Sequence, residues 1–179
     1  MLKDYPKEAI LRDGTVATLR PLHEEDTSEL YKFFSSLSKK ARAFLYDDVT
    51  DRTVVERWTK NINYAFVLPI LAIVNNQIVA DATLHKRSFG PLRHIGRIRI
   101  AVREDYRGKG IGTLLTNELT YIAKDSNLKV LSCMLAEKGE KDAIEAMEVL
   151  GFEKATVIPN YAMDIDGNID NVVLMMKNL

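Results

Sequence analysis

The sequence has one cysteine, Cys133, and three histidines among its 179 residues. A lone cysteine cannot form a disulfide within the chain, and there is no Cys/His cluster to hold a metal. We expect Cys133 to be a small buried apolar residue rather than a nucleophile. The 25 basic residues are matched by 25 acidic ones, so no basic excess favours non-specific binding to nucleic acid. We therefore expect neither a metal nor a nucleic-acid partner.

Long hydrophobic segments are also missing. The longest apolar run, residues 64–74, contains Pro69 and is far shorter than the roughly 20 residues that span a bilayer. The first eight residues carry four charges and lack the apolar segment of a signal peptide. We expect a cytoplasmic protein with no membrane partner. With 46% hydrophobic residues, the length predicts a single domain over residues 1–179.

The most informative feature that is present is a strand, loop and helix pattern at residues 94–124. Residues 94–102 alternate and are rich in β-branched side chains, which indicates a strand. The loop RGKGIG follows at residues 107–112, and apolar residues then recur at helical spacing from Leu114 to Ile122. Glycine lets a ligand approach the backbone closely, and the first N–H groups of a helix carry partial positive charge. The segment therefore predicts a site for a phosphate-bearing ligand.

Two familiar phosphate-binding loops do not fit this segment. A Walker A loop ending at Lys109 needs glycine at position 103 and serine or threonine at position 110, where Arg103 and Gly110 stand. A dinucleotide fingerprint starting at Gly108 needs glycine or alanine at position 113, where Thr113 stands. A glycine-rich turn that merely connects a strand to a helix remains the structural alternative.

The run V-x-x-x-Y-R-G-K-G-I-G-T-L-L at residues 102–115 resembles the acyl-CoA signature R/Q-x-x-G-x-G/A of the GNAT superfamily of N-acetyltransferases. The L-G-F-E at residues 150–153 matches the same family, and the opening segment (LRDGT, LRP, EED, LSKKAR) resembles bacterial and archaeal protein-lysine acetyltransferases. The resemblance implies that the loop holds the pyrophosphate of acetyl-CoA and that the preceding strand pairs with its pantetheine arm. The implied cosubstrate-binding residues are Ile100, Ala101, Val102, Arg107, Gly108, Lys109, Gly110, Ile111, Gly112 and Thr113.

The same resemblance implies an α/β (α+β) fold of the GNAT type, with a mixed sheet of six or seven strands and about four helices. We expect this sheet to splay apart between the central strand and the next one along, near Val130. The local patterns predict hairpins over residues 8–22 and 155–177, strands at 66–74, 77–85 and 129–135, and helices after Pro21, near a capping box at Thr53, after Gly110 and before Gly151.

Acetyl transfer needs a neutral amine, a polarised thioester carbonyl and a proton for the departing thiolate. A free lysine amine has a pKa of about 10.4, so a general base normally assists. By resemblance, the usual glutamate would stand near Gly96 and Arg97 and the usual tyrosine at Met147, so neither is present. Glu137 and Tyr161 are the candidate replacements, and a structural or solvated role is the alternative for each. Met147 has the spacing of a core residue.

Two arginines, Arg97 and Arg99, fall in the predicted central strand, where an unpaired buried charge would be costly. If residues 88–92 form the connection, Asp81 stands opposite Arg99 and is its expected partner. Alternatively, the arginines lean towards the acceptor entrance and meet an acidic substrate.

The sequence thus predicts an N-acetyltransferase that moves an acetyl group from acetyl-CoA to a primary amine by direct attack, without an acyl-enzyme. The acceptor is a protein lysine or a small amine, and the resemblance leaves a homodimer open. The alternative is a CoA-binding sensor or interaction module with little or no turnover, because the usual glutamate and tyrosine are absent.

Overall fold

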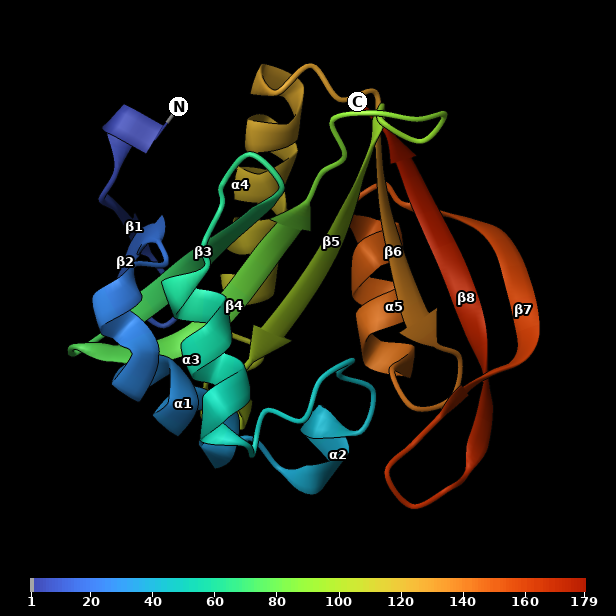
Figure 1. Cartoon of the computed structure of the whole chain (residues 1–179), viewed down its shortest axis with the longest axis horizontal. Helices are drawn as coiled ribbons and strands as arrows, with labels where there is room; N and C mark the ends of the chain where they lie inside the picture. The colour runs from blue at the N-terminus through green and yellow to red at the C-terminus, as the bar shows by residue number, and fades with distance from the viewer. Residues whose placement is uncertain (1) are drawn as a thin grey trace.

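The computed structural model describes residues 2–179, which form one mixed sheet of eight strands in the order β1-β2-β3-β4-β5-β6-β8-β7. All neighbouring strands are antiparallel except β5 and β6, which are parallel (Figure 1). The prediction of six or seven strands was therefore too low, because the hairpins at both ends of the chain join the sheet. The strands are β1 (Lys7–Ile10), β2 (Val16–Pro21), β3 (Val67–Val74), β4 (Gln77–His85), β5 (Ile95–Val102), β6 (Val130–Ala136), β7 (Glu153–Met163) and β8 (Ile169–Asn178).

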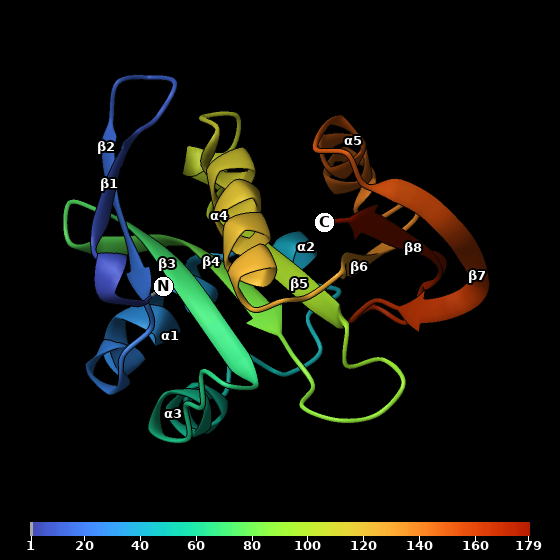
Figure 2. The same ribbon diagram turned by 90° about the horizontal axis from the view of Figure 1, so that it is seen from above.

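Helices cover both faces of the sheet. Figure 2 shows α4 and α5 on one face and α1 and α3 on the other. The predicted capping box at Thr53 was wrong, because Asp51 precedes the helix and its carboxylate accepts a hydrogen bond from Thr53 N at 2.9 Å. The helices are α1 (Thr27–Ser36), α2 (Lys39–Arg42), α3 (Arg52–Lys60), α4 (Ile111–Asp125) and α5 (Lys141–Val149), and the 3₁₀ turns are Leu2–Asp4, Glu24–Asp26 and Glu104–Tyr106.

The two layers of helices produce two hydrophobic clusters. Leu115, Leu119 and Ile122 of α4 are fully buried against the sheet, and each such side chain contributes about 1.5–3 kcal/mol through burial. On the opposite face, the Phe34 ring meets the Trp58 ring edge-on, with centroids 5.7 Å apart. Trp58 is therefore part of the core between α1 and α3 rather than a free stacking surface.

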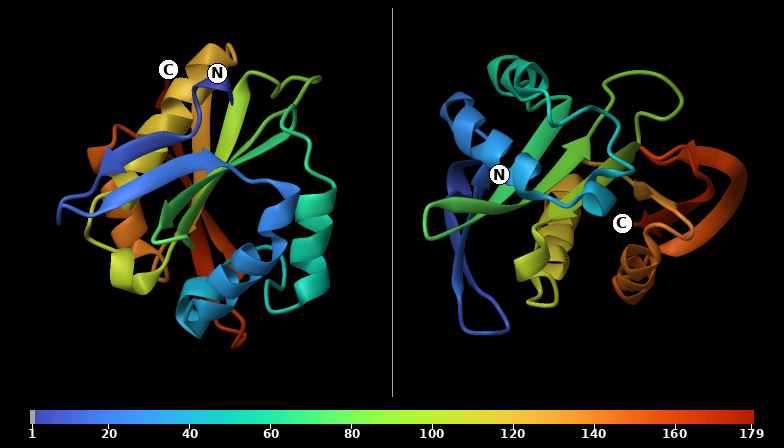
Figure 3. Two further views of the ribbon diagram at one scale, coloured as in Figure 1. Left: turned by 90° about the vertical axis from the view of Figure 1, so that its left-hand side faces the viewer. Right: turned by 90° about the horizontal axis from the view of Figure 1, so that it is seen from below.

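The sheet opens between β5 and β6, as predicted. These strands pair only where Ile95 to Arg97 face Val130 to Ser132, whereas β6 stays paired with β8 as far as Ala136. Beyond Arg97 the two strands diverge (Figure 1). Figure 3 shows α2 at the end of this gap, between the two helical layers. The divergence leaves one edge of β5 without a strand partner at the position where a ligand is expected.

The register of the β4–β5 hairpin differs from the prediction by two residues. Asp81 stands opposite Ala101, and Thr83 stands opposite Arg99, so the predicted Asp81–Arg99 pair was wrong. Two turns in the connection explain the offset. Arg93 N donates to Gly90 O and Ile95 N donates to Leu92 O, so residues 90–94 lie in turns and β5 begins only at Ile95, later than the predicted strand.

Candidate active site

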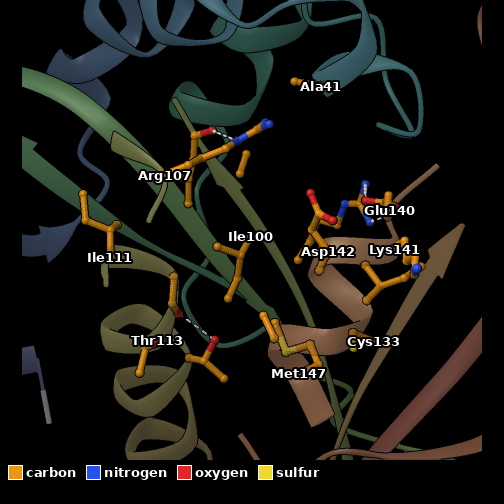
Figure 4. A pocket seen from close by; sticks show the side chains of 18 of the residues that line it. Ala41, Ile100, Arg107, Ile111, Thr113, Cys133, Glu140, Lys141, Asp142 and Met147 are labelled. Carbon is orange, nitrogen blue, oxygen red and sulfur yellow. Dashed lines mark hydrogen bonds and ion pairs between the residues drawn. The ribbon is translucent and has the colours of Figure 1, made fainter. Parts of the chain in front are cut away.

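A cavity of about 600 Å³ lies where β5 and β6 separate, within the range of about 300–1,000 Å³ typical of small-molecule sites. In Figure 4, Arg107 and Thr113 face it from one side and Glu140 and Met147 from the other, with Ile100 of β5 between them. The wall is completed by residues 37–45, which follow α1 and include α2 and the start of the next loop. It includes Leu37, Lys40, Ala41, Phe44 and Leu45.

The start of α4 presents an open backbone to this cavity. Gly108 and Gly110 have φ angles of 75° and 90°, in the left-handed region that favours glycine. Gly110 is the N-cap of α4, and as a glycine it has no side chain to bond the first N–H groups of the helix. The first helical hydrogen bond runs from Leu114 N to Gly110 O at 3.0 Å. A Cβ added to Gly112 would meet no atom within 4 Å. Unpaired N–H groups beside empty space form an anion-binding helix end.

Most of the predicted cosubstrate residues meet in this cavity. Its wall contains Ile100, Ala101, Val102, Arg107, Gly108, Gly110, Ile111, Gly112 and Thr113. Lys109 does not line it. The Lys109 ammonium lies 3.0 Å from the Asp13 carboxylate and 4.6 Å from the centre of the Tyr106 ring. The hydrogen bond with Asp13 raises the pKa of Lys109, and the same bond lowers the pKa of Asp13 to about 2.

Arg12, in the turn between β1 and β2, lines the cavity and was missed by the sequence analysis. Its backbone N–H bonds Lys109 O at 3.1 Å, which fastens the hairpin turn to the glycine-rich loop. Residues 12 and 109 are almost a hundred positions apart, so no local pattern could have connected them.

On the far wall, Arg99 joins four parts of the chain. Its guanidinium forms an ion pair with Glu140 at 2.8 Å and bonds the carbonyl oxygens of Phe44 at 3.2 Å and Met134 at 3.3 Å. Glu140 also accepts a bond from Ala136 N at 2.9 Å. This arrangement holds the loop after α2 and the start of α5 to β5 and β6, so the wall is fixed before any ligand enters.

The predicted catalytic residues lie away from the cavity wall. The Glu137 carboxylate, at the end of β6, accepts a hydrogen bond from the Asn171 side chain at 2.7 Å. Tyr161, on β7, is 63% exposed. Met147 is buried and lines the cavity, as does Cys133, whose pKa burial raises to about 12. Cys133 is therefore a neutral thiol at physiological pH, which makes it a poor nucleophile.

Within residues 2–179, no cluster of three or more His, Cys, Asp or Glu residues could hold a metal ion. No helix in the same range is long and apolar enough to cross a bilayer.

The sequence model of the Acetyltransferase (GNAT) family matches residues 22–152, most of the chain. The chain therefore belongs to the GNAT family of acetyltransferases. The matched segment contains the glycine-rich loop, the separated strands and both helices that flank the cavity.

Solved structures of GNAT proteins share this fold. The GNAT domain of S. lividans PAT is 15% identical with a TM-score of 0.80, and 97% of each chain is covered. A ribosomal-protein-alanine N-acetyltransferase from Brucella melitensis is 22% identical with a TM-score of 0.77, covering 90% of this chain and 99% of the other. The yncA protein from Salmonella typhimurium, solved with its cofactor acetyl-CoA, is 18% identical with a TM-score of 0.77, covering 91% and 94%.

Proposed function

We propose that the protein transfers an acetyl group from acetyl-CoA to a primary amine by direct attack. The observation that carries this proposal is the open N-terminus of α4 at Gly110–Thr113, which faces a cavity beside the unpaired edge of β5. The pyrophosphate would bind the helix end, and the pantetheine arm would run along β5 into the gap. The residues of the site fit acetyl-CoA, since the glycine-rich loop leaves free space at Gly112 for a phosphate and the cavity has the volume of a small-molecule site.

In this reaction the amine nitrogen attacks the thioester carbon after losing or sharing its proton with a base. A C–N bond forms, the C–S bond breaks, and the thiolate of CoA takes up a proton. Within residues 100–102 of β5, the backbone N–H groups that are not used in pairing with β4 would stabilise the oxyanion. Direct transfer is supported by the state of Cys133, because its raised pKa keeps the thiol on the cavity wall neutral.

The acid and base remain predictions. Glu137 is kept as the candidate base because it directly precedes Lys138, Gly139 and Glu140 of the cavity wall, although its carboxylate accepts a hydrogen bond from Asn171. Tyr161 belongs to β7, and its exposed hydroxyl is the candidate proton donor. We keep both as proposals, together with the single domain over residues 1–179, a cytoplasmic location and a possible homodimer.

For the acceptor, we favour an amine on a protein over a small amine. One similar structure is named as acting on an alanine of a ribosomal protein. A second cavity of about 510 Å³ adjoins the first through shared residues Lys40, Phe44, Lys138 and Gly139, and it extends to the β7–β8 turn. This provides room for a chain that continues beyond the reacting amine.

The phosphate site is tested with Gly112→Val. Because space around Gly112 is empty, the substitution should leave the melting temperature nearly unchanged while its side chain fills the phosphate position. Calorimetric binding of acetyl-CoA is expected to be lost. Asn117→Val is the matched control, since it places the same β-branched residue at an exposed position of α4 away from the cavity. Normal acetyl-CoA binding by Gly112→Val would contradict the site.

Turnover is tested separately by measuring CoA release over a panel of peptides and small amines. A protein that binds acetyl-CoA but acetylates nothing, itself included, would favour the sensor. The observation that keeps this second function open is Met147, an unreactive side chain on the cavity wall at the position of the family's usual tyrosine.

A further inference from the structure

We propose that Arg12 binds the pyrophosphate of coenzyme A and that Lys109, despite its place in the glycine-rich loop, is a structural residue. This inference rests on the proposed function, because it identifies a further residue of the same cosubstrate site. It assigns a binding role to the turn between β1 and β2, which lies outside the loop and helix that form the rest of the phosphate site.

The position of Arg12 is set by the backbone. Arg12 N donates to Lys109 O at 3.1 Å, so the turn cannot move independently of the loop. The Arg12 side chain then passes over Gly110, where its Cγ and Nε lie 3.4 Å from the point that a Cβ on Gly110 would occupy. Gly110 is the residue that caps α4. The guanidinium is therefore held beside the helix end that faces the cavity.

The charge of Arg12 is available, whereas that of Lys109 is not. Within the described part of the chain, no hydrogen bond or ion pair engages the Arg12 guanidinium. Lys109 is paired with Asp13 and lies over the Tyr106 ring. Neighbouring residues of one turn thus have opposite tasks, since Asp13 neutralises the loop lysine while Arg12 stays free on the cavity side.

An unpaired guanidinium beside the N-terminus of α4 favours the binding of an anion. The N-terminus of α4 is itself partially positive, and Arg107 adds a full charge on the same wall. The Arg107 side chain donates to Val102 O at 3.4 Å, and its only acidic neighbour in the described part of the chain is Glu104, at 3.8 Å. Like charges gathered beside a helix end repel one another unless an anion lies between them. The planar guanidinium of arginine can donate two parallel hydrogen bonds to a phosphate, which a lysine ammonium cannot do.

The test measures affinities for CoA and for dephospho-CoA, which lacks the 3′-phosphate, by calorimetry. Arg12→Gln is expected to lower the affinity for both CoA and dephospho-CoA by about tenfold, the loss typical of one charge-assisted hydrogen bond. Arg12→Lys should recover part of that loss. Arg87→Gln is the matched control, because it removes an exposed arginine outside the cavity. Lys109→Gln should lower the melting temperature and change affinity by less than threefold.

Several results would overturn the inference. An unchanged CoA affinity in Arg12→Gln would remove Arg12 from the site, and a loss confined to CoA would assign it to the 3′-phosphate instead. If Arg12→Gln lowers the melting temperature and reduces turnover equally with acetyl-CoA and with S-acetyl-pantetheine, Arg12 is structural. The reason is that S-acetyl-pantetheine is an acetyl donor without a phosphate. If the wild-type protein binds neither CoA nor acetyl-CoA, the proposed function fails as well, so the two failures are distinguishable.

Discussion

Replacing Asp81 by asparagine is expected to change how stability depends on pH. Asp81 lies on β4 opposite Leu71 of β3 and Ala101 of β5, which belong to the hydrophobic cluster beneath α1 and α3. The Thr83 hydroxyl donates to its carboxyl group at 3.2 Å. The residue keeps some exposed surface, but its carboxyl group is desolvated, and this raises its pKa from 3.8 to about 7.

A raised pKa means that the folded protein keeps a proton that the unfolded chain releases. Below pH 3.8 both states are protonated and the full stability is present. As the pH rises towards about 7, only the unfolded state ionises, so the free energy of unfolding falls by about 1.36 kcal/mol per pH unit. Over the interval from 3.8 to about 7, the fall amounts to about 4 kcal/mol.

The amide of the Asp81→Asn variant cannot ionise, so this variant should not show the fall. Urea unfolding of wild type and Asp81→Asn between pH 4 and 8.5 should therefore give curves that diverge, with the variant gaining up to about 4 kcal/mol at the upper end. Thr83→Val removes the hydroxyl that favours the ionised form and should extend the fall to higher pH. Asp125→Asn, at the exposed end of α4, controls for the loss of one negative charge. Parallel curves for wild type and Asp81→Asn would refute the reasoning.

Two further predictions concern Arg99, on the far wall of the cavity, and Glu137, which lies beside that wall. Arg99→Met should lower the free energy of unfolding by about 2–3 kcal/mol in urea melts, because it leaves Glu140 partly buried without its cation. The double variant Arg99→Met with Glu140→Gln should lose less stability than the sum of the two single losses. Strict additivity would mean that the pair is not coupled. Glu137→Gln should lower kcat by about 10²–10⁴ with acetyl-CoA affinity unchanged if Glu137 is the base; an unaltered rate would leave the amine to be deprotonated by solvent.

The elements of this fold were predictable where local physics decides them. The alternation in β5, the glycines before α4 and the apolar spacing in α4 each determine a backbone conformation from neighbouring residues alone. The turn between β3 and β4 also follows from its own residues, since Asn75 and Asn76 adopt positive φ angles of 48° and 60°, which asparagine tolerates. The short helix α2 was not predicted, because four residues are too few to show a helical period.

Pairings between distant segments could not be obtained in this way. The β4–β5 register depended on two turns in an irregular connection, and an error of two residues keeps every side chain on its correct face while giving each a wrong partner. Arg99 was therefore expected to meet Asp81, although it reaches Glu140 across the gap between β5 and β6. The pattern predicted that the charge needs a partner, and only the fold identified it.

The phosphate site shows the same division within a single motif. The glycines of the loop determine where the backbone N–H groups point, and their spacing was sufficient to predict where a phosphate would bind. The charges of the loop are different, because a lysine side chain is long enough to choose among partners from elsewhere in the chain. Asp13 engages Lys109 and the adjacent Arg12 stays free, so the hairpin turn both removes one cation from the site and supplies another. A glycine pattern can therefore locate a phosphate site in a sequence, whereas its counter-charges must be assigned from the tertiary contacts.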